Sequence, residues 1–218
     1  DSCIGCGNCL KACPHQARRY VDDFDAFLAD LADGVPIVGI VAPSAAASFP
    51  ETYLNLIGWL KGKGLRAAFD VSFGAELTAY SLVEHIRTNS PRLVIASPCP
   101  AIVTFVQTYH PELLEYLAPI DSPMLHTIKM IRAYYPQFAD CRIAAISPCA
   151  AKKRELADGG QGDYNITYQS LARHLLESGI DLSREPVGAF ENASAERAVS
   201  FSTPGGLLHT AQRWMPEL

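Results

Sequence analysis

Four closely spaced cysteines near the start of the chain constrain its structure most strongly. They are Cys3, Cys6, Cys9 and Cys13, followed by Pro14, in the spacing C-x2-C-x2-C-x3-C-P. Thiolates at such short intervals can converge on one inorganic centre, and this spacing is typical of iron–sulfur cluster ligands. Gly5 and Gly7 allow the backbone to turn around the centre and to aim N–H groups at its sulfides. The first 20 residues therefore predict a [4Fe–4S]-binding segment.

Zinc and disulfides explain this run less well. Zinc sites are usually built from separated C-x2-C pairs. The total of seven cysteines is odd, and neighbouring cysteines would compete for partners. In two-cluster ferredoxins the fourth cysteine of a run binds the other cluster, but this chain has one run and begins at Asp1, two residues before its first cysteine. We expect a fragment whose natural sequence continues upstream, in which case Cys13 lacks its cluster partners here.

The composition indicates a globular chain with a substantial core. Its 218 residues suffice for one large domain with a small addition, and 49% of them are hydrophobic. A net charge of −5 argues against a nucleic-acid-binding protein, which would normally carry a basic patch. The sequence has no stretch of about 18 apolar residues, so no membrane span is expected. Thiolate cluster ligands favour a reducing compartment, and we expect the cytoplasm.

Beyond the cysteine run, short apolar segments alternate with amphipathic ones. Buried strands are predicted over residues 36–42, 65–71, 92–97 and 142–147, with a short strand at 165–167. Helices are predicted over residues 22–31, 54–61, 76–87, 102–109, 123–135 and 171–177. This alternation predicts an α/β fold with parallel sheets covered by helices. We divide the chain into a cluster segment of residues 1–20 and a domain of residues 21–218.

Each of the four longer predicted strands ends in a segment of small or polar residues. The segments are Ala42-Pro43-Ser44, Ser72-Phe73-Gly74, Pro98-Cys99-Pro100 and Pro148-Cys149-Ala150. Ligands of open α/β sheets bind beyond the carboxyl ends of strands, so these segments are expected to line one cavity. Cys99 and Cys149 occupy equivalent places, and Lys152 and Lys153 follow. Together they could bind a second, anionic iron–sulfur group, because lysine offers it charge and N–H donors.

These residues also have ordinary structural explanations. A single buried cysteine is usually a small hydrophobic side chain, although the repeated Pro-Cys context favours a site. Lys152 and Lys153 could belong to a solvated basic surface, and Gly205-Gly206 to a turn. Cys141 lies outside every motif and is expected at the surface as a free thiol.

Taken together, the motifs resemble the catalytic subunit of [FeFe]-hydrogenases, in family order over residues 3–208. After the cysteine run, the matching segments are residues 42–44, 69–78, 97–101, 111–113, 122–123, 147–155 and 201–206. The last two resemble the family patterns M-P-C-x-x-K-K-x-E and F-G-x-T-G-G. Each motif alone is weak, whereas the ordered set is specific.

The resemblance implies a fold, cofactors and a reaction. The fold would be a two-lobed α/β domain of parallel sheets flanked by helices, with an N-terminal half-ferredoxin segment. The cofactors would be a [4Fe–4S] cluster on Cys3, Cys6, Cys9 and Cys13 and, in the full-length protein, an H-cluster, which joins a [4Fe–4S] cubane to a two-iron subcluster. The reaction would be the reversible splitting of H2 into protons and electrons.

The resemblance also implies roles for single residues. Cys99 and Cys149 would be two cubane ligands, and Lys152 would hydrogen-bond a cyanide of the two-iron subcluster. Glu155 would fix the Lys152 loop through an ion pair. The other positions expected around the cofactor are Pro43 and Ser44 in the pocket for diatomic ligands, Ser147 in place of a methionine, and the pair Gly205 and Gly206.

Several positions depart from the family pattern. Pro98 replaces the cysteine that passes protons to the cofactor, and Leu82 and His85 replace relay carboxylates. These changes resemble the sensory subgroup and predict slow turnover. No cysteine follows Cys149, so the two cubane ligands of the family's third cysteine motif are missing, and this fragment alone is expected to be inactive.

We therefore expect a fragment, truncated at both ends, of a slow H2- or redox-sensing [FeFe]-hydrogenase. Its partners would be H2, protons, and electron-transfer or signalling modules that could lie on the same full-length chain, and a homodimer is compatible with this hypothesis. The alternative is a non-enzymatic iron–sulfur protein on the same scaffold, for electron transfer or cluster assembly. The match at Pro43, Phe73 and Lys152 favours the hydrogenase, because those positions serve the two-iron subcluster.

Overall fold

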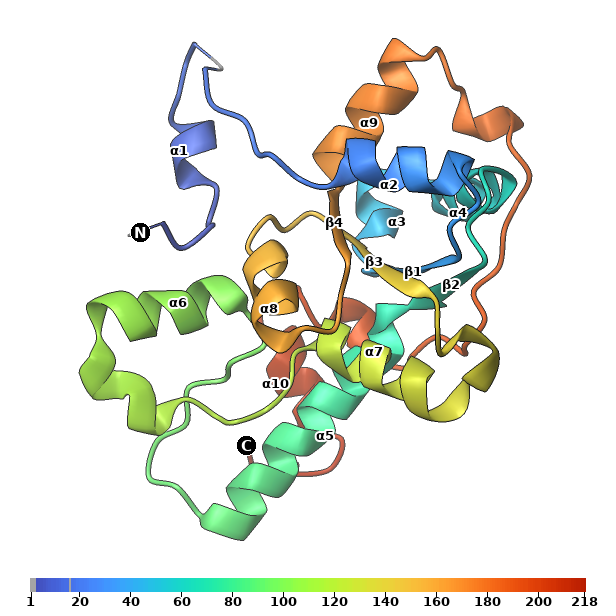
Figure 1. Ribbon diagram of the computed structural model, residues 1–218. Helices are drawn as coiled ribbons and strands as arrows, with labels where there is room; N and C mark the ends of the chain where they lie inside the picture. Colours follow the sequence, from blue (N-terminus) through green and yellow to red (C-terminus); the bar gives the residue numbers. More distant parts are fainter. Residues whose placement is uncertain (1–2, 16) are drawn as a thin grey trace.

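A four-stranded parallel sheet lies between two layers of helices (Figure 1). The computed structural model describes residues 3–15 and 17–218. The strands are β1 (Ile37–Val41), β2 (Ala67–Asp70), β3 (Arg142–Ser147) and β4 (Tyr164–Thr167), in the order β2-β1-β3-β4. Val41 pairs with Asp70 on one side and Ile146 on the other, so these strands end at one edge of the sheet. The predicted α/β class, with parallel strands between helices, is confirmed.

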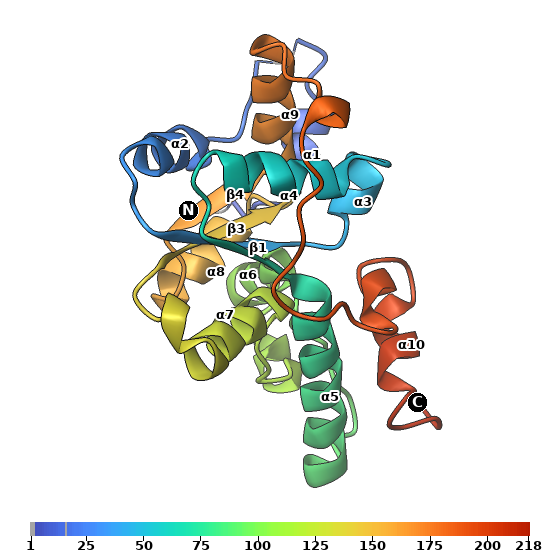
Figure 2. The same ribbon diagram turned by 90° about the vertical axis from the view of Figure 1, so that its right-hand side faces the viewer.

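Helices cover both faces of the sheet (Figures 1 and 2). One layer contains α2 (Phe24–Ala32), α3 (Ala45–Ser48), α4 (Tyr53–Gly62) and α9 (Tyr168–Glu177); the other contains α5 (Val71–Asn89), α7 (Pro123–Tyr134), α8 (Lys152–Gly159) and α10 (Gly206–Ala211). Beside the sheet, on the side of α8, lie α1 (Asn8–Lys11) and α6 (Pro100–Tyr109). Short 3₁₀ helices occur at Pro111–Tyr116, Pro136–Phe138, Leu182–Arg184 and Ala198–Ser200. Within the described residues, every helix is too short or too polar to cross a lipid bilayer.

The strands are apolar on both faces because both faces are covered. Ile37 and Val41 of β1 belong to the core formed with α2, α4 and α9. Val38 and Ile40, which alternate with them, pack into the core that contains residues of α7. The apolar run at residues 37–41 is thus a central strand, as its composition predicts.

Polar residues at the strand ends also start helices. The Asp70 carboxylate accepts the N–H of Ser72 at 2.8 Å where α5 begins, and the Thr167 hydroxyl accepts the N–H of Ser170 at 3.2 Å in α9. Such caps satisfy N–H groups that lack a partner in the first helical turn. Residues 72–74, expected as a loop after a strand, therefore lie inside α5, which begins five residues before the helix predicted at 76–87.

The strand predicted over residues 92–97 does not form. Leu93 is 52% exposed, and the segment makes one isolated parallel bridge, between Ile95 and Leu117. In the described part of the chain no other strand lies beside it to complete a ladder. The apolar composition of residues 92–97 is therefore not sufficient to form a strand.

The helices α3, α8 and α10 were not predicted, because their local sequence offers no clear apolar periodicity.

Cys141 is buried, at 8% exposure, so the prediction that it lies at the surface was wrong. It immediately precedes β3 and belongs to the core that contains residues of α7. Burial raises the pKa of its thiol, which favours the uncharged form. Cys141 is therefore a small core side chain.

Candidate functional site

A cavity of about 370 Å³ lies where β1, β2 and β3 end. Its lining includes Pro43 and Ser44 after β1, Val71 after β2, Pro98 before α6, Ser147 at the end of β3, and Cys149 and Lys152 after β3. Three of the four segments predicted to meet at one cavity, 42–44, 98–100 and 148–150, contribute to its lining, whereas residues 72–74 do not. The cavity brings together five of the predicted site residues, namely Pro43, Ser44, Ser147, Cys149 and Lys152.

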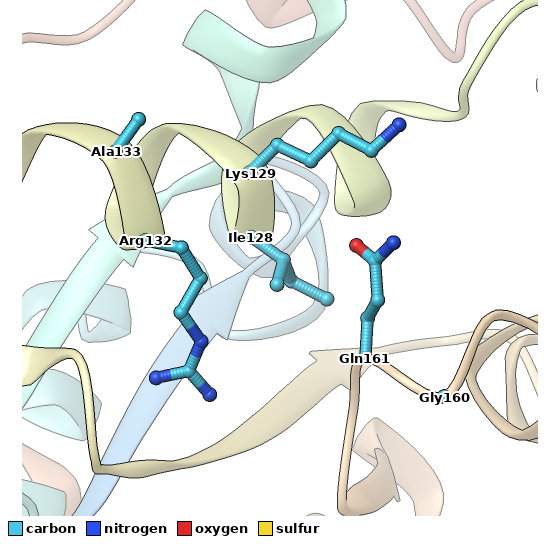
Figure 3. Close-up of a pocket in the computed structure, with 6 residues that line it drawn as sticks. All are labelled: Ile128, Lys129, Arg132, Ala133, Gly160 and Gln161. Atoms are coloured by element: carbon cyan, nitrogen blue, oxygen red, sulfur yellow. The ribbon is translucent and has the colours of Figure 1, made fainter.

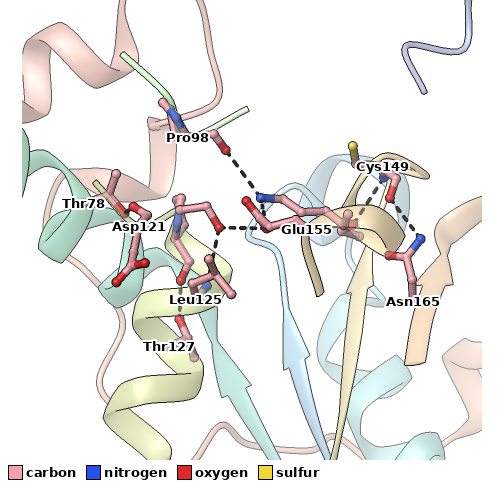
Figure 4. A network of polar contacts seen from close by, with 12 residues as sticks. Thr78, Pro98, Asp121, Leu125, Thr127, Cys149, Glu155 and Asn165 are labelled. Atoms are coloured by element: carbon pink, nitrogen blue, oxygen red, sulfur yellow. Dashed lines mark hydrogen bonds and ion pairs between the residues drawn. The ribbon is translucent and has the colours of Figure 1, made fainter. Parts of the chain in front are cut away.

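Lys152 supplies the positive charge at this cavity. Its side chain is nearly buried, and its ammonium donates to Glu155 Oε2 at 2.7 Å and to the Pro98 carbonyl at 3.4 Å (Figure 4). Lys152 and Glu155 both lie in the first turn of α8, where their three-residue spacing places them on one face of the helix. A lysine has three N–H donors, so two acceptors among the described residues leave one for a ligand in the cavity.

Glu155 is held from a second direction. The Ser122 hydroxyl donates to Glu155 Oε2 at 2.9 Å and accepts the N–H of Leu125 at 3.4 Å, which caps α7. The carboxylate thus joins α8 to the start of α7, behind the lysine (Figure 4). Glu155 does not line the cavity. Glu155 instead orients Lys152 through the ion pair that the resemblance implies.

The Cys149 loop is fixed by two backbone contacts. The Cys149 N–H donates to Ser147 Oγ at 3.2 Å, and Asn165 of β4 donates its amide N–H to the Cys149 carbonyl at 3.3 Å (Figure 4). Asn165 is buried, and its Oδ1 atom is the one buried side-chain oxygen or nitrogen without a partner in the described part of the chain. The role of Asn165 was not predicted from the sequence. Its contact with Cys149 depends on the pairing of β4 with β3, and this pairing is known only from the strand order of the sheet.

Tyr168 holds the loop that contains Pro43 and Ser44. Its hydroxyl donates to the Ala42 carbonyl at 2.7 Å and accepts from Ser44 Oγ at 3.5 Å. Burial raises the pKa of this phenol, so it remains a neutral donor. The sequence offered no signal for this role, because 126 residues separate Tyr168 from Ala42.

Replacing Tyr168 by phenylalanine is expected to lower the free energy of unfolding by about 1–3 kcal/mol, because the Ala42 carbonyl loses its buried donor. Chemical denaturation would measure the change. Tyr134→Phe is the matched control, since Tyr134 is 78% exposed and should be near neutral. Equal stabilities of the two variants would contradict the role of the Tyr168 hydroxyl.

Besides Glu155, three residues that the resemblance places around the cofactor do not line the cavity. Cys99 follows Pro98, occupies the position before α6 without a capping bond from its side chain, and is exposed. Gly205, with φ +78°, precedes α10, and a Cβ on Gly206 would lie 2.0 Å from the Ser200 carbonyl oxygen. This crowding shows that Gly206 permits a close backbone approach. The neighbouring Phe201 and Ser202, rather than the glycines, reach the cavity.

The N-terminal cysteine loop packs against the first turn of α8. Arg154 donates to the Cys3 carbonyl at 3.0 Å, and a Cβ on Gly5 would lie 2.9 Å from the Ala151 Cβ. Ala151 is two residues from Cys149, so the loop lies next to the segment that follows β3. The linker behind it is also tied to α8, by the ion pair of Lys153 with Asp23 at 2.7 Å.

The donor chemistry of this loop fits an iron–sulfur cluster. Cys3, Cys6 and Cys9 are exposed, Cys13 is half-buried, and none of them forms a disulfide. Gly5 and Gly7 have φ of +73° and +79°, a left-handed conformation that lets the loop turn between the thiols. Within residues 3–15 and 17–218, no three potential ligand side chains converge on a metal-sized point. Cluster binding would therefore draw these thiols together.

The pKa of the Tyr20 phenol is affected by the N-terminal cysteines and by Cys149. Burial raises the pKa of its phenol, and the negative charges of Cys149, Cys9, Cys6 and Cys3 raise it further. Cysteines of the loop and Cys149 of the sheet domain therefore influence the pKa of one side chain.

The predicted relay positions do not reach the cavity. Leu82 is buried on α5, and His85 contacts Asn89 one turn further along the same helix. Neither residue lines the cavity, and Pro98 presents only a carbonyl oxygen to Lys152.

A second hollow, of about 500 Å³, does not provide a better site (Figure 3). Its two basic side chains have partners already. Lys129 pairs with Asp121, and Arg132 donates to the carbonyls of Phe138, Ala139 and Cys141. No residue that lines it is a carboxylate or a thiol.

Two family models match the chain. Residues 35–218 match the iron-only hydrogenase large subunit, C-terminal domain, and residues 1–19 match the 4Fe–4S binding domain. The two matches divide the chain between the cysteine loop and the sheet domain.

Individual relatives agree with these matches. The chain is 28% identical to iron hydrogenase 1 of Clostridium pasteurianum over 81% of its own length and 36% of the relative's. It is 26% identical to the periplasmic [Fe] hydrogenase large subunit of Nitratidesulfovibrio vulgaris over 99% of its length and 66% of the relative's. It is 23% identical to the cytosolic Fe–S cluster assembly factor NAR1 of Encephalitozoon cuniculi over 83% of its own length and 50% of the relative's. The chain thus spans between about one third and two thirds of these relatives.

The fold matches a solved structure of a single-residue variant of the [FeFe]-hydrogenase HydA1 from Chlamydomonas reinhardtii. The TM-score is 0.69 at 26% identity, over 88% of this chain and 57% of that one.

Proposed function

The chain belongs to the family of the iron-only hydrogenase large subunit, C-terminal domain, and on this premise we propose that it is part of a slow, sensory [FeFe]-hydrogenase. The reaction would convert H2 reversibly into two protons and two electrons. The observation that carries the proposal is the cavity in which Lys152, Cys149, Pro43 and Ser44 meet at the ends of two adjacent strands.

An H-cluster would supply the H2-binding iron pair when present. Cys149 would hold its cubane, with Cys99 as a second ligand, and the other thiolates would come from outside this chain, because Cys141 is buried in the core. Lys152 would direct its remaining N–H at an anionic ligand of the iron pair. The nearly buried pair with Glu155 keeps that ammonium in place, since a buried charge without a partner is strongly unfavourable.

Electrons would leave through the N-terminal [4Fe–4S] cluster. The contact of Gly5 with Ala151 and the bond from Arg154 to Cys3 support this path, because they hold the cysteine loop beside the Cys149 segment. Pro98 bears no ionisable group, so proton transfer at that position would be impaired. Slow turnover suits a sensor, which needs H2 occupancy rather than flux.

We further propose a cytoplasmic protein whose electrons pass to a signalling or electron-transfer module. A non-enzymatic role in iron–sulfur cluster assembly is the second candidate, and the similarity to the cluster assembly factor of Encephalitozoon cuniculi supports it. Lys152 separates the two candidates, because its N–H serves a ligand of the iron pair rather than a cubane.

The proposed function predicts slow hydrogen–deuterium exchange by the full-length protein after anaerobic maturation. Exchange should be measured by mass spectrometry of the gas phase. Lys152→Met, which keeps the apolar stem and removes the ammonium, should abolish it, while Lys153→Met at the surface should not. Absence of exchange in the loaded wild-type protein would favour the assembly role instead.

A further inference from the structure

Tyr20 lies directly against the loop that carries the N-terminal cysteines. A Cβ on Gly7 would be 2.3 Å from the Tyr20 hydroxyl oxygen, so the hydroxyl occupies the space that any other residue at position 7 would fill. Gly7 lies between Cys6 and Cys9 and has φ +79°. Both the conformation and the contact therefore require glycine at this position.

The phenol faces the cysteine loop, because its hydroxyl contacts Gly7, the residue after Cys6. Negative charge on the loop thiols and on Cys149 raises the pKa of the phenol beyond the effect of burial. Among the described residues the hydroxyl has no hydrogen-bond acceptor, since Tyr20 takes part in none of the side-chain bonds found there. A half-buried donor facing thiols is suited to bond a sulfur.

The surroundings hold this arrangement in place. Arg154 and Ala151 fix the first part of the loop on α8. On the other side, Asp22 and Asp23 follow Tyr20 closely and are bound to β4: Asp22 accepts the Thr167 N–H at 2.8 Å, and Asp23 accepts the Asn165 N–H at 3.1 Å. Tyr20 is therefore anchored at one end of a linker that is tied to the sheet.

We propose that Tyr20 is a positioning residue that donates a hydrogen bond to a sulfur of the N-terminal [4Fe–4S] cluster. This proposal rests on the proposed function, because it requires a cluster on the loop. Hydrogen bonds to the sulfurs of a cluster help to set its reduction potential. The bond stabilises the reduced cluster, which carries one more negative charge, and so raises the potential.

The test is a redox titration of the full-length protein, followed by electron paramagnetic resonance. The signal of the N-terminal cluster is identified as the one lost in Cys6→Ser. Tyr20→Phe keeps the ring and removes the donor. It should shift the reduction potential of the cluster to more negative values by up to about 59 mV. For a one-electron couple, a shift of that size lowers the ratio of reduced to oxidised cluster tenfold at a fixed applied potential. Iron and sulfide contents should not change, and Tyr134→Phe should leave the potential in place.

An unchanged potential in Tyr20→Phe, with full iron content, would overturn the proposal. Loss of iron in this variant would also overturn it, because it would show that the hydroxyl only supports the loop. A wild-type protein without iron on the loop would instead contradict the proposed function, so the two failures are distinguishable.

Discussion

Replacement of Cys6 by serine is expected to remove most of the iron that the 218-residue chain binds after anaerobic reconstitution. Cys6 is the second of four thiols in the loop and is exposed, so its loss removes a ligand without disturbing the core. A serine hydroxyl is a harder and far less acidic ligand than a thiol, and cluster irons are held by thiolates. Iron, acid-labile sulfide and visible absorbance would measure the loss.

Cys141→Ala is the control for this experiment. Cys141 is buried in the core and lies outside the loop, so this variant should retain the iron. Equal iron contents in Cys6→Ser and in the unchanged chain would contradict the assignment of the loop.

Turnover by the matured full-length protein is expected to be about 10²–10⁴-fold below that of [FeFe]-hydrogenases with a thiol at the place of Pro98. Positioned proton transfer contributes a factor of that size, and neither the proline ring nor its carbonyl can transfer a proton. The carbonyl also accepts a bond from Lys152. H2 oxidation with an artificial electron acceptor would measure the rate.

The variant Pro98→Cys should raise turnover, but by less than the full factor. Leu82 and His85 stand at the other relay positions, and neither reaches the cavity, so a second interruption remains. Rapid turnover by the unchanged protein would show that protons reach the cofactor without a thiol at position 98, and the interrupted relay would then not limit the rate.

Residue patterns with short periods predicted the central part of the fold. The apolar segments at 37–41 and 142–147 form β1 and β3, because strands covered on both faces must be apolar along their whole length. The carboxyl-end rule for α/β sheets placed Pro43, Ser44 and Cys149 at one cavity without knowledge of the strand order.

Long-range contacts could not be predicted in this way. Residues 92–97 have the composition of a strand, but a strand forms only where a neighbour completes its backbone bonds. Among the described residues this segment makes one isolated bridge, from Ile95 to Leu117. Tyr168, Asn165 and Tyr20 act through partners that are distant in the sequence. Nothing in their local sequence distinguishes them from ordinary polar residues.

The infrared spectrum of the matured full-length protein tests the central claim most directly, namely that the cavity of Lys152 and Cys149 holds the two-iron subcluster. Bound carbon monoxide and cyanide absorb where proteins do not. The proposed function predicts such bands in the unchanged protein, a shift of the cyanide bands in Lys152→Met, and loss of all bands in Cys149→Ala. A protein that carries its N-terminal cluster, has been exposed to the maturation machinery and still shows no such bands would contradict the assignment of the cavity.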